Sequence, residues 1–124
     1  MTETLRVSSI DPDHTKWKDP GNDVADLASW RIDAWAWLTR EPSQIESRLI
    51  LRWLANEGIF AQILNQRGVH FETSPDGFAE DTNTVRRLVI IAGREAPRIV
   101  KENEQMNEQL QAEIKRINDE LSNG

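Results

Sequence analysis

The sequence predicts a mostly α-helical protein, in which a small helical domain precedes a long C-terminal amphipathic helix that can form a short coiled coil. Three observations favour this fold class. Apolar residues recur with the period of a helix over much of residues 24–66. Toward the C-terminus they recur in heptads. Strand and turn signals are concentrated in residues 68–81, where we expect a short β-hairpin or a structured loop.

The chain of 124 residues is long enough for one small domain with an appendage. Residues 1–23 are polar and broken by proline and glycine, which predicts an irregular arm. Residues 24–96 are expected to form the helical domain. Residues 97–124 are expected to form a C-terminal oligomerisation helix.

The first helix is expected to end at Arg40, because Pro42 disfavours helical geometry in the residue before it. On a helical wheel, Ile32 and Trp35 share one apolar face. A second apolar face lies more than a quarter turn away and holds Leu27, Trp30, Ala34, Trp37 and Leu38. A helix with two apolar faces is normally covered on both sides, and a chain this short can leave one face uncovered.

The stretch WRIDAWAWLTR, residues 30–40, holds three of the five tryptophans. A central core helix explains all three. A partner surface built on Ile32 and Trp35 is the functional alternative. Base stacking is disfavoured, because stacking sites lie in positively charged grooves and the basic residues near in sequence are Arg31 and Arg40.

A second helix is expected over residues 44–66. Ser43 and Glu46 have the spacing of a capping box, which marks a helix start. The apolar stripe keeps its phase across Gly58, which favours one continuous helix, and Gly68 suits the position just after its end.

A third helix is expected to begin at Asp81 or Thr82 and to be interrupted at Gly93 and Pro97. Pro97 can occupy the first turn of the next helix, where its missing N–H is not needed. The buried face of the third helix consists of Val85, Leu88, Val89 and Ala92.

The final segment carries a heptad seam. One core position holds Val100, Asn107, Ile114 and Leu121, and the other holds Asn103, Leu110 and Ile117. Because the flanks are rich in Glu, Gln and Lys, we expect the seam to pair with a second copy of the chain. Asn107 favours a parallel dimer, since a buried Asn pairs best with its own copy. The alternative is an amphipathic helix folded back on the domain.

The amino-acid composition disfavours or excludes several classes of function. The net charge of −6, from 21 acidic and 15 basic residues, disfavours nucleic acid as a partner, and no membrane-binding patch or membrane span is visible. With no cysteine, Cys-based zinc sites and thiol nucleophiles are excluded. His70 and Glu72 form an H-x-E pattern, but a zinc deaminase also needs cysteine ligands.

We therefore expect a cytoplasmic, non-enzymatic protein with no cofactor and no metal. It would act as an oligomeric adaptor, assembly factor or inhibitor that binds itself and one further, unidentified protein partner. The alternative is a dimeric DNA-associated regulator of transcription or replication. A DNA regulator must concentrate Arg and Lys on one face of the folded dimer, whereas an adaptor need not.

Overall fold

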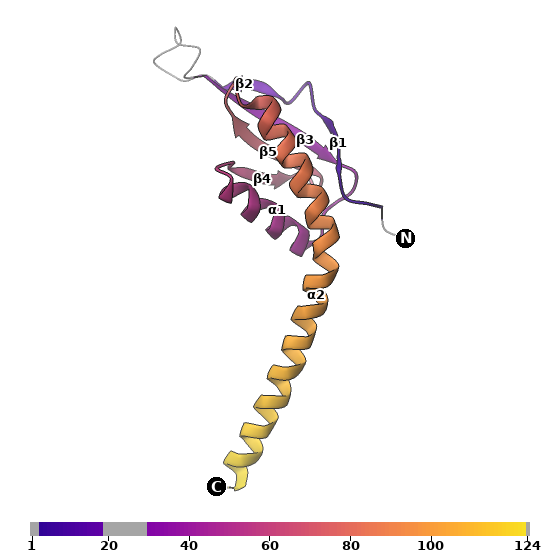
Figure 1. Cartoon of the computed structure of the whole chain (residues 1–124), viewed down its shortest axis with the longest axis vertical. Coiled ribbons are helices and arrows are strands. Elements are labelled where there is room, and N and C mark those ends of the chain that lie inside the picture. The colour runs from indigo at the N-terminus through magenta and orange to yellow at the C-terminus, as the bar shows by residue number, and fades with distance from the viewer. Residues whose placement is uncertain (1–2, 19–29, 124) are drawn as a thin grey trace. The chain divides into compact units, whose positions relative to one another are not determined.

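The computed structural model describes residues 3–18 and 30–123 and divides the chain into two compact units, Met1–Arg94 and Glu95–Gly124. The first unit contains a five-stranded antiparallel sheet with helices (Figure 1). The second unit is helical. The structure has β1 (Val7–Ile10), β2 (Lys16–Lys18), β3 (Arg31–Leu38), α1 (Gln44–Asn56), β4 (Ala61–Leu64), β5 (Gly68–Thr73) and α2 (Phe78–Asn123).

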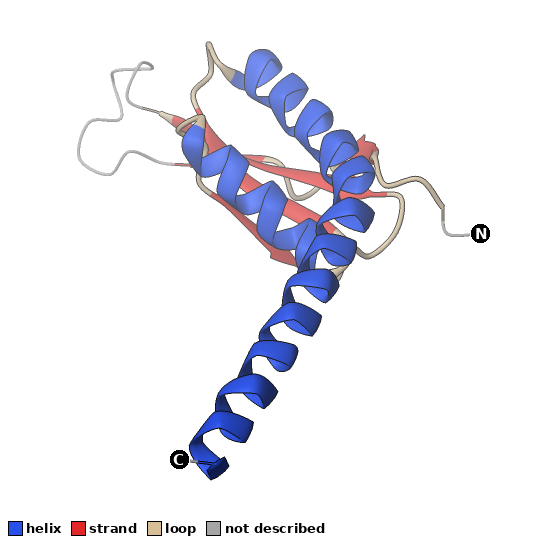
Figure 2. Ribbon diagram, turned by 60° about the horizontal axis from the view of Figure 1, so that its bottom comes forward, coloured by secondary structure: helices blue, strands red, loops and turns tan. Residues whose placement is uncertain are grey.

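The prediction of a mostly α-helical fold is wrong, because the first unit is a mixed α/β structure. The strand order is β1-β3-β5-β4, and β2 pairs with β3 beyond the end of β1. β1 and β2 come from the segment that was predicted to be an irregular arm. α1 and the first part of α2 cover one face of the sheet (Figure 2).

The helix predicted for residues 23–40 is the central strand β3 from Arg31 onward, and residues 23–29 lie outside the described residues. Ala34, Ala36 and Leu38 are buried beneath the helices, whereas Trp35 and Trp37 alternate with them and are only partly buried. The segment therefore follows the two-residue period of a strand. Helical periodicity fitted it too, because short apolar runs are ambiguous between the two structures.

The capping box at Ser43 and Glu46 is confirmed, and it begins α1. The single helix predicted for residues 44–66 is wrong, since α1 ends at Asn56. Gly58 follows with φ of +79°, a left-handed conformation that glycine adopts without strain and that ends a helix. The remaining residues of the predicted helix form β4.

The β-hairpin expected within residues 68–81 is not formed, because β5 is followed by α2 from Phe78 and pairs instead with β4, which precedes it. Asn65 and Gln66 make the turn with φ of 51° and 69°. Gly68, predicted to follow a helix, is the first residue of β5. The strand signal in VHFE is thus correct, whereas its partner strand β4 had been predicted to be part of the second helix.

α2 begins at Phe78, before the predicted caps Asp81 and Thr82, and continues through Gly93 and Pro97. The predicted interruption is therefore wrong. Proline removes one helical hydrogen bond, but the good helix formers on both sides keep the helix continuous. Gly93 has a packing role, since a Cβ there would lie 3.0 Å from the Cβ of Leu5.

The core lies between the sheet and the two helices. The predicted helical face is confirmed: Val85, Val89 and Ala92 are fully buried, and Leu88 packs against the core. A buried carboxylate, that of Glu46, is paired with Arg40, which donates to both of its oxygens at 2.7 and 2.8 Å. The core proper comprises Leu5, Ala34, Ala36, Leu38, Ile50, Leu54, Ile59, Val69, Phe71, Val85, Val89 and Ala92.

Candidate functional site

The sheet has a second face, turned away from the helices, which we call the open face. Strand alternation places Asp33, Trp35 and Trp37 of β3 on it, because their neighbours in sequence are buried beneath the helices. Directly paired residues of neighbouring strands share a face. The register therefore adds Lys16 and Lys18 of β2, Arg31 of β3, Gln62 of β4, and His70 and Glu72 of β5.

Trp35 lies at the centre of an aromatic cluster on the open face. It stacks against His70 with ring centroids 4.9 Å apart and planes 23° apart. The Trp37 ring is 5.9 Å away and the His14 ring 5.5 Å away. The two histidines of the chain thus flank one tryptophan, although they are 56 residues apart in sequence (70 − 14).

Gly68 explains how the Trp35 ring fits against the sheet. A Cβ atom at Gly68 would lie 3.0 Å from Cε3 and Cζ3 of that ring. Tryptophan therefore occupies the space that a side chain on β5 would fill. The glycine is required by this close approach of a ring to the backbone.

Asp11 holds the loop between β1 and β2 against the open face. Its carboxylate accepts hydrogen bonds from the backbone N–H groups of Asp13 and His14, and from Nε1 of Trp37 at 2.7 Å. Oδ2 of Asp11 also lies 2.8 Å from Nδ1 of His14. The Trp37 hydrogen bond, with those of His14 and Asp13, holds the pKa of Asp11 well below its usual range despite partial desolvation.

A charged cluster lies beside the aromatic rings. Glu72 accepts from Nζ of Lys18 at 3.0 Å and from Nε of Arg31 at 3.2 Å. These contacts, led by the hydrogen bond from Lys18, lower the pKa of Glu72 and raise that of Lys18. Asp33 lies 3.9 Å from Nε2 of His70. Lys16, opposite Asp33 in the register, is exposed and forms no salt bridge with the described residues.

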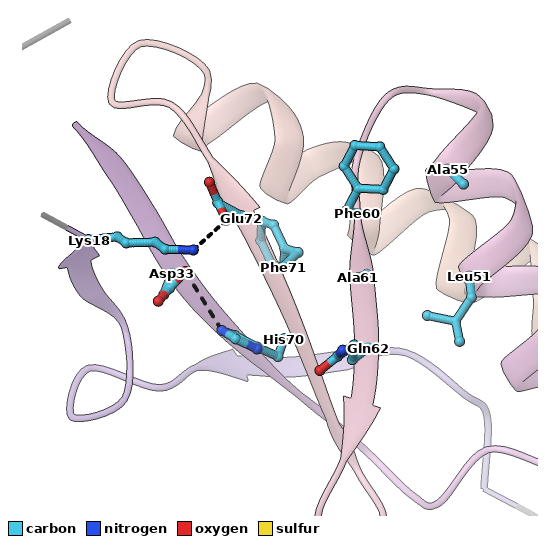
Figure 3. Close-up of a pocket in the computed structure, with 10 residues that line it drawn as sticks. All are labelled: Lys18, Asp33, Leu51, Ala55, Phe60, Ala61, Gln62, His70, Phe71 and Glu72. Atoms are coloured by element: carbon cyan, nitrogen blue, oxygen red, sulfur yellow. Dashed lines mark hydrogen bonds and ion pairs between the residues drawn. The ribbon is translucent and has the colours of Figure 1, made fainter. Parts of the chain in front are cut away.

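A groove of about 440 Å³ runs beside this cluster, and Figure 3 shows the side chains that line it. Phe60 stands at its rim with 79% of its surface exposed. The lining is mixed, with cationic, anionic, amide and aromatic groups within one groove. Its residues are Lys18, Asp33, Leu51, Ala55, Phe60, Ala61, Gln62, His70, Phe71 and Glu72.

The two residues proposed as a partner surface, Ile32 and Trp35, lie on opposite faces of β3. Ile32 packs against the core, whereas Trp35 is on the open face. They cannot form one surface, because the strand places odd and even residues on opposite sides. Base stacking had been disfavoured for lack of nearby cations, and this premise is also wrong. Pairing of β2 with β3 brings Lys16 and Lys18 alongside Arg31.

The seam of the C-terminal helix lies on α2. All seven of its side chains are exposed; those of Leu110, Ile114 and Ile117 are 56%, 40% and 42% exposed. Ion pairs within the helix join Arg98 to Glu95 and Glu102, and Arg116 to Glu113 and Glu120. The seam residues are Val100, Asn103, Asn107, Leu110, Ile114, Ile117 and Leu121.

Sequence reasoning missed Phe60, Gln62, Lys16 and Lys18 as members of one site. The strand signals around these residues were weak. KWK is only three residues long, and the alternation from Phe60 to Leu64 also fitted the apolar stripe of the predicted second helix. The residues meet through pairings that no local pattern reveals.

Comparison of the chain with protein-family models, with characterised proteins and with solved structures found no match. Within residues 3–18 and 30–123, no helix combines the length and apolarity that a membrane span requires. In the same part of the chain, no group of three or more His, Asp or Glu side chains is placed to hold a metal ion.

Proposed function

We propose that the protein is a non-enzymatic interaction module of the cytoplasm that assembles as a parallel dimer through its C-terminal helix. The observation that carries this proposal is the exposed heptad seam from Val100 to Leu121. The absence of cysteine fits a reducing compartment. In the dimer, each copy offers one open face to a further partner.

The exposed apolar stripe of this segment supports pairing. Residues 100–121 span about three heptads of α2, and in proteins most helix stability comes from packing an amphipathic face rather than from intrinsic propensity. Exposed ion pairs such as Arg116–Glu120 add only roughly 0.3–0.5 kcal/mol each. Burying the apolar stripe against a second helix supplies the larger stabilisation.

The charges flanking the seam are compatible with two parallel copies. In a parallel dimer, the residue before each first core position faces the residue after the next second core position on the partner helix. Like charges meet in none of these pairs. They are Ile99 with Glu104, Met106 with Gln111, and Glu113 with Asn118.

The test compares two aspartate substitutions two residues apart in the full chain. Ile114→Asp places a charge in the seam, whereas Ala112→Asp places the same charge on the opposite side of the helix. We expect sedimentation equilibrium to give a dimer for the natural chain and for Ala112→Asp. Ile114→Asp should give a monomer whose tryptophan fluorescence remains native. A monomeric natural chain, or two variants that behave alike, would refute the dimer.

A further inference from the structure

We infer that the open face binds single-stranded nucleic acid, with unpaired bases stacked on its aromatic side chains and a phosphate held by its cationic end. The inference stands apart from the proposed dimer, because every residue of the site belongs to one copy. It begins with the aromatic groups. The exposed ring of Phe60, which directly precedes β4, and the stacked pair of Trp35 on β3 with His70 on β5 offer two positions for a base.

The cations lie on β2 and the adjoining end of β3, toward the other edge of the sheet from Phe60. Lys16, Lys18 and Arg31 lie at one end of the open face, opposed there by Asp33 and Glu72. Lys16 has no salt bridge to the described residues and is therefore the cation most available to a phosphate. Because the charges nearly balance, we expect a weak salt dependence and micromolar rather than nanomolar affinity.

The groove beside Phe60 supplies polar groups that can read a base edge. Gln62 offers an amide, which can both donate and accept. Asp33 offers a carboxylate, which accepts from exocyclic amino groups such as that of cytosine. A stacking ring, an amide and a carboxylate around one groove match the needs of a base better than those of an aliphatic ligand.

The same features argue against a second sheet as the occupant. Packing a protein sheet here would take Lys18, Arg31 and Glu72 out of water, and desolvating such a cluster costs several kcal/mol per ion. A duplex is also disfavoured, since its bases are already stacked on one another and offer no free faces to the rings. A single strand exposes base faces and leaves the ion pairs hydrated.

The experiment uses the full chain and a fluorescein-labelled single-stranded oligonucleotide of mixed sequence, prepared as RNA and as DNA, with fluorescence anisotropy as the readout. Phe60→Ala should weaken binding about tenfold, because one base–ring stack is lost. Phe60 is exposed, so the variant should keep its fold. Binding that Phe60→Ala leaves unchanged, or no binding to either single strand, would overturn the inference.

Two variants that each remove one positive charge test whether Lys16 contacts a phosphate. Lys16→Gln should weaken binding and lower the slope of log affinity against log salt by about 0.7, the value for one phosphate contact of a single strand. Arg48→Gln removes the same charge from an exposed position on α1 and should do neither. Equal effects of the two variants, tighter binding of the matching duplex, or equally tight binding of a mononucleotide would each count against a strand on the open face.

Discussion

The two halves of α2 carry the same kind of apolar stripe in two different environments. In the first half, Val85, Val89 and Ala92 are completely buried in the core of the sheet unit. In the second half, Ile114 and Ile117 remain 40% and 42% exposed. The apolar stripe in the first half of α2 is buried within the sheet unit, whereas the side chains of the stripe in the second half remain exposed. Substitutions should therefore act on stability in the first region and on assembly in the second.

The largest effect should come from removing a core side chain of the sheet unit. Phe71 is 1% exposed, and Phe71→Ala should lower the free energy of unfolding by roughly 3–5 kcal/mol, because it leaves a cavity. Urea denaturation followed by tryptophan fluorescence measures this. Phe60→Ala is the matched control and should change stability by less than about 0.5 kcal/mol. A loss for Phe71→Ala as small as that expected of the control would contradict the core position of Phe71.

A somewhat smaller loss should follow from breaking the buried ion pair. Glu46→Ala removes the partner of Arg40 and half of the capping box of α1, and should cost roughly 3 kcal/mol. Glu41→Ala, at an exposed position nearby, serves as the control in the same urea titration. If Glu46→Ala denatures at the same urea concentration as the natural chain, the pair adds nothing to stability.

The pH dependence of stability should identify the same pair. The hydrogen bonds from Arg40, helped by Ser43 and opposed by burial, lower the pKa of Glu46 below its ordinary value of 4.5. A lowered folded-state pKa gives stability that is present above pH 4.5 and is lost as the pH falls through the folded value. Glu46→Gln should therefore flatten the acid side of a plot of unfolding free energy against pH. An unchanged slope would assign the acid sensitivity to other carboxylates, such as Asp11.

Sequence reasoning succeeded where a pattern depends on neighbours along the chain. The capping box of Ser43 and Glu46, the buried face of Val85 to Ala92 and the helical state of the C-terminal segment all rest on contacts within about two turns. Helix signals of this kind are local, so one sequence is enough to read them.

Sequence reasoning failed where the structure depends on the pairing of strands that are far apart in the sequence. The residues Ala34 to Trp37 satisfy both a helical wheel and strand alternation, and pairing with β5 settles the matter. Gly58 was compatible with an unbroken stripe, yet the left-handed backbone there ends α1. The open face could not be foreseen, because its members come from β2, β3, β4 and β5 and meet through hydrogen bonds between strands.

The smallest effect on the sheet unit should come from the polar layer of the seam. Asn107→Leu should strengthen self-association and admit trimers or larger assemblies, because a buried Asn selects the dimer at a cost in stability. Sedimentation velocity over a range of concentrations measures both changes. The free energy of unfolding in urea, followed by tryptophan fluorescence, should stay within about 0.5 kcal/mol of the natural value. A variant that remains strictly dimeric with unchanged affinity would place Asn107 outside the interface.

The most direct test of the seam uses the fact that the chain has no cysteine. Asn107→Cys introduces one thiol at a core position, and a parallel in-register dimer brings the two copies of that position within reach of a disulfide. Gln105→Cys places the thiol on the opposite side of the helix. Under mild oxidation the dimer predicts rapid, nearly complete crosslinking of Asn107→Cys and little of Gln105→Cys. Equal crosslinking of the two variants, or none at position 107, would contradict the parallel seam.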